Sequence, residues 1–562
     1  MKMDNMKLKK QSGLVLYVLL IFLTLSGAVY GDTFIWGTEG NGFLISDFSN
    51  MPIEKKEIMN QVNQTLGVKY VKVRVSLPIG GEPTPSVCSW HQAFYTGDDP
   101  LCDKPDAFHY NLDQTAELFE KNGWSMFPMF SHAGGPGCDI PIDSTHIERF
   151  VDFVDWFVGR YGEKADIQYI ELVNAPYHVW GGTEKQLLEL NNKTYERIKT
   201  KYPDVKVGTP GFEYYRDTAT KLHGQDQHRF RNYFLNNDAK FDFWAFHGYP
   251  ILGDAGRTDI YPPTKTASHD SLAGIKGIIE LRKRMNERGW QDRDIIDTEH
   301  TGLFIQGRRF SEDEDRANAA FMVQELVLKR SLELEGKKVL AGIISLKMLP
   351  HCERSREDRK KSGGTQMQRP DRKNPGPPQG LPPRAPHGLR PEIQGIQRPV
   401  GTFGSRPGAG GRGGMTESSS EKSIFDAECA WGSLNPDGSP SETVQAVGLL
   451  ISKLKGLDHA GHISGNFDDT STVWIEKFSA PGRDLYICFK PFAYRSGKAP
   501  AIETATLPGT IKLTGNPDKI EITDIFGTEI KPGSGQTISI QVGNAPQFID
   551  VIPEFCTGIV KN

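Results

Sequence analysis

Eight short apolar runs, alternating with long amphipathic segments, constrain the fold of residues 33–455 more than any other feature. Each run is apolar on both faces, as a parallel strand covered on both sides must be. The runs are 33–37, 70–75, 125–130, 168–173, 205–209, 241–247, 294–298 and 341–347. Helices are expected at 53–66, 112–122, 145–161, 184–200, 227–236, 269–288, 312–333 and 441–455. This succession predicts the α/β class and a (β/α)8 TIM barrel, whose reactive groups lie at the carboxyl ends of the strands.

Local signals for helix starts agree with this pattern. A capping box pairs a Ser or Thr before the helix with a Glu or Gln three residues later, so that each side chain binds the other's backbone N–H. The predicted boxes are Thr145 with Glu148, Thr183 with Gln186, and Ser311 with Glu314.

The pattern changes after about residue 461. Short alternating runs such as STVWIEKF, RDLYICFK and KIEITDI follow one another, separated by Gly, Pro and Asp. Such spacing is typical of an antiparallel sandwich. We therefore predict a barrel at 32–460 and a C-terminal antiparallel β-sandwich domain at 461–562.

Residues 353–420 have a different composition. They hold 13 Gly and 10 Pro among 68 positions, with 13 Lys or Arg against 6 Asp or Glu. No apolar period runs through them, so they cannot bury enough surface to offset the entropy of ordering. We predict a disordered, basic insertion between strand eight and helix eight. It is either a tolerated loop or a salt-sensitive attachment to an anionic polysaccharide or acidic surface.

The overall charge limits the classes of partner. The 562-residue chain carries a formal net charge of −4, so it is not a polycationic nucleic-acid binder. No nucleic-acid-recognition pattern and no phosphate-binding glycine motif is present, and we predict no nucleic-acid partner. Oligomeric state cannot be read from the sequence.

The first 31 residues carry a targeting signal. Lys7, Lys9 and Lys10 precede a long apolar run that ends in small residues near Ala28 and Gly31. This order predicts a secretory signal peptide at 1–31. The mature protein would then be secreted, periplasmic or on the cell surface, with no membrane contact after cleavage. The alternative is an uncleaved membrane anchor, because the run is nearly long enough to span.

Seven cysteines in an exported chain permit disulfides. Cys88 and Cys102 bracket a short loop, and bridging it would stabilise the fold by about 3 kcal/mol. Cys138 competes for either partner, and Cys352 is the candidate for an unpaired thiol. The alternative is several buried free cysteines. No Cys or His spacing indicates zinc, and we expect no cofactor or metal.

Polar residues gather where the predicted strands end. They are Arg74 on the second strand, His132 after the third, Asn174 after the fourth, His247 and Tyr249 at the sixth, and Glu299 at the seventh. Oriented donors around one carboxylate suit a polyhydroxylated ligand, and Trp180 and Trp431 are candidate platforms for sugar rings. The alternatives are an ordinary ion-pair role for Arg74, core roles for the histidines, and packing roles for the tryptophans.

Four motifs on these strands make a resemblance specific. They are Glu171-Leu-Val-Asn174-Ala175-Pro176, His247-Gly-Tyr249-Pro250, Thr298-Glu299 and the segment from Trp431 to Gly438. The chain resembles the clan A retaining glycoside hydrolases and, within them, glycoside hydrolase family 39. The resemblance implies that Glu299 is the nucleophile and Arg74 keeps it ionised. It further implies that Asn174 binds the sugar 2-hydroxyl, that His247 and Tyr249 steady the nucleophile and sugar, and that Glu171 lies inside the barrel.

The chain departs from the family at one decisive position. The acid/base glutamate of the family falls at 175, where this sequence has alanine. Retention needs two carboxylates about 5–5.5 Å apart, and losing the acid/base typically costs about 10²–10⁴ in rate. Either another group supplies the proton, with His178, Tyr177 and His300 expected near the vacated spot, or the site binds sugar without hydrolysis.

We therefore expect an exported glycosidase that acts on β-linked oligo- or polysaccharide with retention, through Glu299 and an impaired or substituted acid/base. The alternative is a non-catalytic carbohydrate-binding pseudoglycosidase.

Overall fold

The computed structural model describes the barrel strands, most of the helices around them and two C-terminal sheets. The described residues are 34–39, 61–78, 115–133, 144–176, 180, 182–213, 229–248, 268–270, 273–301, 311–344, 346–347, 439–465, 473–491, 493–495, 502, 507–515, 520–530, 538–552 and 556–560. They all belong to one unit, formed by 1–353 and 426–562.

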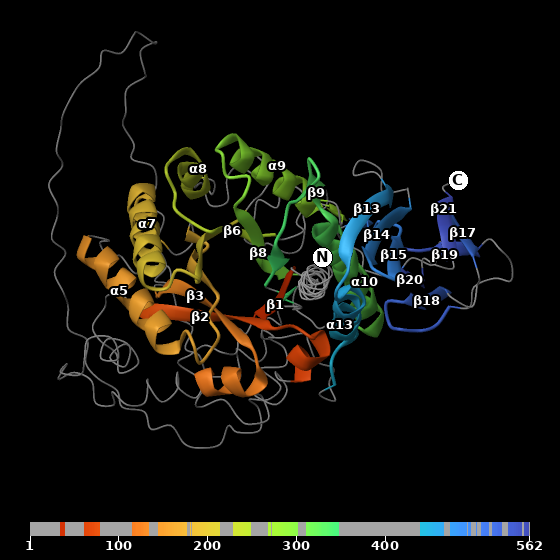
Figure 1. The fold of residues 1–562 in the computed structure, drawn as a ribbon, viewed down its shortest axis with the longest axis horizontal. Coiled ribbons are helices and arrows are strands. Elements are labelled where there is room, and N and C mark those ends of the chain that lie inside the picture. The colour runs from red at the N-terminus through yellow and green to blue at the C-terminus, as the bar shows by residue number, and fades with distance from the viewer. Residues whose placement is uncertain are drawn as a thin grey trace, which may run out of the picture. The chain divides into compact units, whose positions relative to one another are not determined.

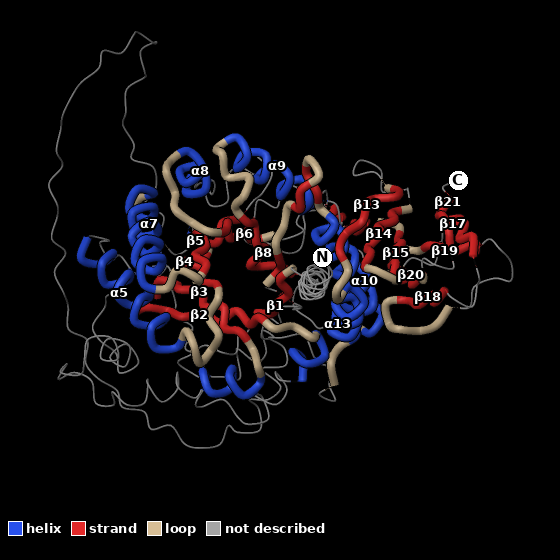
Figure 2. The backbone as a smooth tube through the Cα atoms, in the orientation of Figure 1, coloured by secondary structure: helices blue, strands red, loops and turns tan. Residues whose placement is uncertain are grey.

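Parallel strands close into a barrel, seen end-on as a ring in Figure 2. Around the ring they are β1 (Ile35–Glu39), β2 (Tyr70–Pro78), β3 (Ser125–Ala133), β4 (Tyr169–Asn174), β5 (Lys206–Glu213), β6 (Phe243–His247), β8 (Asp294–Thr301) and β11 (Gly342–Ile343). The ring closes because Gly342 of β11 pairs with both Ile35 of β1 and Ile296 of β8. The short β12 (Leu346–Lys347) pairs with the end of β8. The predicted (β/α)8 barrel is confirmed, with every strand at its predicted place.

Helices surround this ring (Figure 2). They are α5 (Ser144–Tyr161), α7 (Glu184–Lys201), α8 (Arg229–Asn236), α9 (Ala273–Glu287), α10 (Glu312–Ser331) and α13 (Glu442–Leu454), with residues 61–66 and 115–122 also helical. The capping boxes of Thr183 with Gln186 and of Ser311 with Glu314 are both present. α5 begins at Ser144, so Thr145 lies inside its first turn.

One predicted helix start is wrong. Residues expected to open the helix at 269 instead form strand β7 (Ser268–Asp270), and α9 begins only at Ala273. β7 pairs with β16 (Ala493–Arg495), which lies more than two hundred residues later in the chain. A pairing over that separation leaves no local pattern, so the periodicity of 269–288 could not reveal it.

The lower part of the barrel interior is apolar. Its buried cluster consists of Ile35, Phe127, Phe243, Ala245, Ile296 and Ile344, with Tyr70 and Tyr169 packed against it. The Phe127 ring stacks on Tyr169 at 6.2 Å and meets Phe243 at 5.9 Å between centroids. Inward side chains fill such barrels in layers, so this plug confines any polar site to the carboxyl ends of the strands.

Antiparallel sheets follow the barrel and are drawn in blue in Figure 1. The larger sheet contains, in spatial order, β13 (Asp458–Ser464), β14 (Trp474–Ala480), β15 (Arg483–Phe489), β20 (Gln547–Val551) and β18 (Ile520–Asp524). The smaller contains β19 (Ile538–Val542), β17 (Leu507–Gly515) and β21 (Cys556–Val560). The predicted antiparallel C-terminal architecture is confirmed, and its first strand begins at Asp458.

Helix α10 forms a wall shared by the barrel and the larger C-terminal sheet. The Gln324 side-chain amide donates hydrogen bonds to the backbone oxygens of Lys490 at 3.0 Å and Asn544 at 2.5 Å. The Arg330 guanidinium donates to Leu457 O at 3.1 Å. Because both sides of the helix are covered, even its charged residues are buried in the second half of its length.

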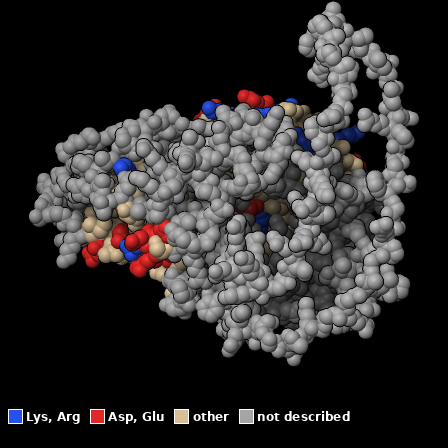
Figure 3. All heavy atoms as spheres, turned by 180° about the vertical axis from the view of Figure 1, so that it is seen from behind, with Lys and Arg blue, Asp and Glu red and all other residues tan. Residues whose placement is uncertain are grey.

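Several predictions fall outside the described residues. They are the signal peptide at 1–31, the insertion at 353–420, and the roles of Cys88, Cys102, Cys138 and Cys352, which all stay predictions. Cys488 is a buried free thiol whose pKa is raised by burial. Within the described ranges, no helix has the length and apolarity to cross a bilayer, and no cluster of side chains could hold a metal ion. Acidic and basic side chains lie beside one another on the described surface in Figure 3.

A buried polar network joins the C-terminal sheet to the hairpin of β9 (Glu333–Leu334) and β10 (Lys337–Lys338). The His459 ring lies between two carboxylates, with Nδ1 2.8 Å from Glu333 Oε1 and Nε2 2.8 Å from Glu476 Oε2. His462 Nδ1 lies 2.9 Å from the other oxygen of Glu476. Burial alone would lower the pKa of His459, but hydrogen bonds to Glu476 and Glu333 outweigh it and raise the pKa.

This network predicts a loss of stability at alkaline pH. Because the folded pKa of His459 is raised, its contribution is complete below the unfolded value of about 6.5 and disappears as pH rises through the folded pKa. We expect the difference in free energy of unfolding between the wild type and His459→Gln to shrink steadily from pH 6 to pH 9. Urea unfolding across that range measures it.

Lys477→Met on β14 is the matched control, because it breaks a 2.8 Å ion pair with Asp484 in the same sheet that involves no histidine. A His459→Gln difference as constant with pH as that of the control would contradict the prediction.

Candidate active site

A polar layer lies directly above the apolar plug of the barrel. On each of four strands, a polar residue lies two positions after a residue of the plug. The pairs, with the plug residue first, are Tyr70 and Lys72, Tyr169 and Glu171, Ala245 and His247, and Ile296 and Thr298. Because side chains alternate along a strand, the polar set shares the inner face of the barrel. Each is at most 2% exposed. Their charges must therefore be compensated by one another.

A chain of charged contacts runs from Lys72 to Glu299. Lys72 Nζ lies 3.1 Å from Glu171 Oε2 and donates a hydrogen bond to Thr298 O at 2.8 Å. Glu171 Oε1 lies 3.7 Å from His247 Nε2, and His247 Nδ1 lies 3.5 Å from Glu299 Oε2. The side chain of Glu299 is 11% exposed, against 0–1% for the other three. The chain thus ends in a carboxylate that reaches solvent.

The charges along this chain alternate in sign. Burial would raise the pKa of Glu171, but the Lys72 ammonium and His247 hold it below its usual range. Burial would lower the pKa of His247, but Glu299 and Glu171 outweigh burial and raise it. A cationic imidazole beside Glu299 favours its carboxylate form, which is the form that a nucleophile requires.

Strand β4 ends in a backbone geometry that side-chain-bearing residues rarely adopt. Val173 has φ +45° and Ala175 has φ +43°, on either side of Asn174. The register between β4 and β5 shifts twice in this stretch. Positive φ at a β-branched residue costs about 1–3 kcal/mol, and such strain tends to collect at functional sites. The strain marks the end of β4 as part of the site.

A glycine on the neighbouring strand makes room for the ion chain. A Cβ on Gly211 of β5 would lie 2.3 Å from His247 Nε2 and 2.5 Å from Glu171 Oε1. Real Cβ atoms do not approach other atoms so closely. Only glycine at this position therefore allows Glu171 and His247 to meet as they do.

The structure overturns His300 as the source of the missing proton. Its imidazole is fully buried and lies on the side of α10, with Nδ1 2.8 Å from Lys329 Nζ. Burial and the Lys329 charge together lower the pKa of His300 to about 3. A histidine that is neutral at physiological pH and closed to solvent cannot protonate a leaving group.

The other predicted site residues have different outcomes. Glu299, His247 and Asn174 lie at the carboxyl ends of β8, β6 and β4. Trp180 is 6% exposed in the main core, and its indole N–H donates to Thr183 O at 3.1 Å.

Arg74 and His132 lie in β2 and β3, but their side chains are outside the described part of the structure. Tyr249, Trp431, Tyr177 and His178 are also outside it. The roles predicted for these residues stay predictions.

Lys72 is the main site residue that sequence reasoning missed. The motifs direct attention to Arg74, two residues further along the same strand. The available signal is a lysine in an otherwise apolar strand buried on both faces, because such a charge requires a buried partner. Naming Glu171 as that partner still required the barrel to be assembled.

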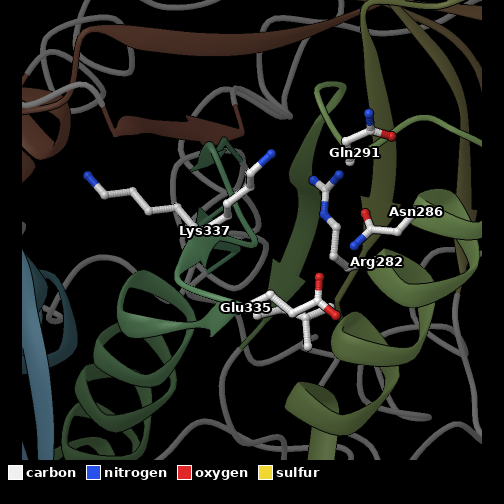
Figure 4. A pocket seen from close by; sticks show the side chains of 7 residues that line it. Arg282, Asn286, Gln291, Glu335 and Lys337 are labelled. Atoms are coloured by element: carbon white, nitrogen blue, oxygen red, sulfur yellow. The ribbon is translucent and has the colours of Figure 1, made fainter.

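A hollow lies at the opposite end of the barrel from the candidate site. Figure 4 shows Arg282 and Asn286 of α9 facing Glu335 and Lys337 of the β9–β10 hairpin, with Gln291 beside them. The Arg282 guanidinium donates to Arg293 O at 2.8 Å and to Val339 O at 3.0 Å. It thereby joins the segment just before β8 to the segment just before β11. These contacts brace the amino-terminal end of the barrel.

The fold defines a class: a closed parallel barrel followed by C-terminal antiparallel sheets. Solved structures of this class include glycoside hydrolases. One is a family 39 glycoside hydrolase from the gut symbiont Bacteroides cellulosilyticus WH2. It matches with a TM-score of 0.53 over 93% of this chain and 81% of its own, at 14% identity.

Other similar structures are more distant. A glucosidase from Croceicoccus marinus has a TM-score of 0.48 at 12% identity, over 92% of this chain and 95% of its own. A GH30 endoxylanase from Clostridium papyrosolvens C71 has a TM-score of 0.43 at 10% identity, over 92% and 96%. No family model and no curated protein matches the sequence. At these identities the family 39 likeness shows a shared fold.

The buried pair predicts a specific stability pattern. Lys72→Met leaves Glu171 charged in a dry interior, so we expect a loss of about 3–5 kcal/mol in free energy of unfolding. The double variant Lys72→Met/Glu171→Gln removes both charges and should recover a large part of that loss. Urea unfolding of the full chain at pH 7 measures both.

Lys193→Met is the matched control, because it breaks a 2.7 Å pair with Glu148 whose side chains are 37% and 49% exposed. It should cost at most about 1 kcal/mol. A double variant less stable than Lys72→Met alone would show that the two charges do not compensate each other.

Proposed function

We propose that this chain is an exported glycoside hydrolase that cleaves β-linked oligo- or polysaccharide with retention, through Glu299 as nucleophile and an impaired or substituted acid/base. The single observation that carries the proposal is the solvent-reaching Glu299 carboxylate at the end of β8, 3.5 Å from buried His247. The family 39 motifs and the likeness in fold to a family 39 enzyme support it.

The proposed first step is attack of a Glu299 oxygen on the anomeric carbon. The bond from that carbon to the leaving oxygen breaks, and a covalent glycosyl–enzyme forms. Water then attacks the same carbon from the opposite face, loses a proton to bulk solvent, and releases Glu299 as the carboxylate. In this proposal His247 steadies the nucleophile throughout, and Asn174 binds the sugar 2-hydroxyl, as the family 39 resemblance implies.

Ala175 removes the usual partner of Glu299. A methyl group can neither protonate the leaving oxygen nor activate water. Among the described residues, Glu171 is joined to Glu299 through His247, but it is fully buried and paired with Lys72. Activity should therefore be slow on oligo- and polysaccharide and faster on substrates whose leaving group departs without a proton, unless a residue outside the described ranges supplies one.

A second function is favoured by the same alanine. A site that keeps Glu299 and Asn174 but lacks the acid/base still suits carbohydrate binding without turnover. Calorimetry with xylo- and gluco-oligosaccharides distinguishes the two proposals when it is read together with the kinetics. Binding without any turnover would favour the pseudoglycosidase.

Export and domain organisation belong to the same proposal. A signal peptide at 1–31 would be removed before Asp32, leaving the barrel at 32–460 and the β-sandwich at 461–562. Amino-terminal sequencing of the mature protein from its host tests this directly. A chain that still begins at Met1 would favour the membrane anchor.

Azide rescue is the decisive kinetic test. We expect slow cleavage of 2,4-dinitrophenyl β-glycosides, because this leaving group needs no proton. Azide should accelerate turnover and yield the β-glycosyl azide, because it attacks the glycosyl–enzyme without a general base. Product analysis by mass spectrometry and release of dinitrophenol measure the effect.

Glu299→Gln is the matched variant and should abolish both the cleavage and the β-azide product. If the wild type releases no dinitrophenol from activated glycosides, with or without azide, the hydrolase proposal is wrong.

Restoring the acid/base should restore activity on natural glycosides. We expect Ala175→Glu to raise kcat/KM on unactivated oligosaccharides by about 10²–10⁴. Ala175→Gln carries a side chain of the same size at the same strained position, where φ is +43°. It should give no gain, because an amide does not donate a proton as an acid. Equal rates for the two variants would contradict the assignment of position 175.

A further inference from the structure

We propose that Lys329 of α10 is a positioning residue, which holds Glu299 and His247 in register with each other from outside the barrel wall. This inference rests on the function proposed above. Lys329 is fully buried and lies behind the strands that carry the site, so it touches no substrate.

One ammonium group ties together the chain segments beside both site residues. Lys329 Nζ donates to Gly248 O at 2.7 Å, and Gly248 directly follows His247. It also donates to Asp297 Oδ2 at 2.8 Å and lies 2.8 Å from His300 Nδ1, on the two sides of Glu299. An ammonium has three N–H donors, and three polar atoms lie within hydrogen-bond distance of this one. The segments carrying His247 and Glu299 therefore share one anchor.

Asp297 and Gly248 complete the connection between the two strands. Gly248 N–H donates to Asp297 Oδ1 at 3.0 Å, so both backbone polar groups of Gly248 are held. A Cβ on Gly248 would lie 2.3 Å from Asp297 Oδ2. The contact therefore requires glycine immediately after His247.

His300 lies against the same anchor. Its Nδ1 is 2.8 Å from Lys329 Nζ and 3.0 Å from Gly248 O. Glu325 Oε2, 3.7 Å from Lys329 Nζ, is the remaining acidic group that faces the anchor.

Positioning from behind affects the reaction through geometry. The Glu299 carboxylate must attack the anomeric carbon in line, and a displacement of about 1 Å can cost about 10²-fold in rate. The 3.5 Å spacing of Glu299 and His247 depends on the registration of β6 against β8. That registration shifts between Phe246 and His247, at the point where Lys329 and Asp297 hold the two strands.

The test uses Lys329→Met and the double variant Lys329→Met/Asp297→Asn in the full chain. Lys329→Met alone leaves the buried Asp297 carboxylate without its cation and can unfold the chain. The double variant also removes that charge, so it serves as the test if the single variant does not fold. On dinitrophenyl glycosides we expect kcat to fall at least about tenfold, with KM within threefold of wild type.

A second readout requires no turnover. The imidazole of His247, which faces Glu299, Glu171 and Lys72, is titrated by NMR in histidine-labelled protein and assigned with His247→Gln. Loosening its contact with Glu299 should lower the pH at which it loses its proton by about one unit in either variant.

Arg330→Met is the matched control, since Arg330 is an equally buried cation on α10 that binds Leu457 O instead of the strand ends. It should lower stability without changing the His247 titration. If the Lys329 variants alter only stability, as the control does, the inference is overturned. If wild type shows no turnover but the His247 titration shifts as expected, the proposed function fails while the anchoring role of Lys329 stands.

Discussion

The need to neutralise charge inside a water-excluding barrel governs the rest of the site. Lys72 and Glu171 are 3.1 Å apart with their side chains at most 1% exposed, and neither is tolerable there without the other. Their pairing leaves one oxygen of Glu171 directed at His247, which in turn faces Glu299. Beside this chain of charges, Gly211 leaves the space that a side chain would fill. The end of β4 next to it has a strained backbone. The geometry of the candidate site therefore begins one layer below the surface.

The roles of the three carboxylates differ because their surroundings differ. Glu171 is dry and paired with a lysine, Asp297 is dry and paired with a different lysine behind the wall, and Glu299 reaches solvent beside a histidine. Only the last can meet a ligand. Two buried lysines, one inside the barrel and one outside, thus flank the strands that carry the site.

Most of the architecture was predictable from the sequence, because buried parallel strands and amphipathic helices repeat in short windows. The strands, two capping boxes and the position of Glu299 follow from such local patterns. Features that depend on contacts between residues far apart in the chain could not be predicted from these local patterns. β7 forms only by meeting β16, Lys72 is explained only by Glu171, and the environment of His300 is set by α10. Its place next to Glu299 in the sequence indicated nothing about which way the His300 side chain points, since one step along a strand reverses the side chain.

The shared wall made by α10 bears on how such a chain can be inherited. Gln324 donates to the backbone oxygens of Lys490 and Asn544, and Arg330 donates to that of Leu457. The acceptors for these buried side chains of a barrel helix therefore come from residues far downstream. The pairing of β7 with β16 is a further contact between the barrel segment of the chain and the segment that follows it. A recombination event that exchanged the C-terminal sheets for an unrelated module would leave buried polar groups of the barrel without acceptors. The two parts are therefore best regarded as one evolutionary unit, whose interface changes only by matched substitution on both sides.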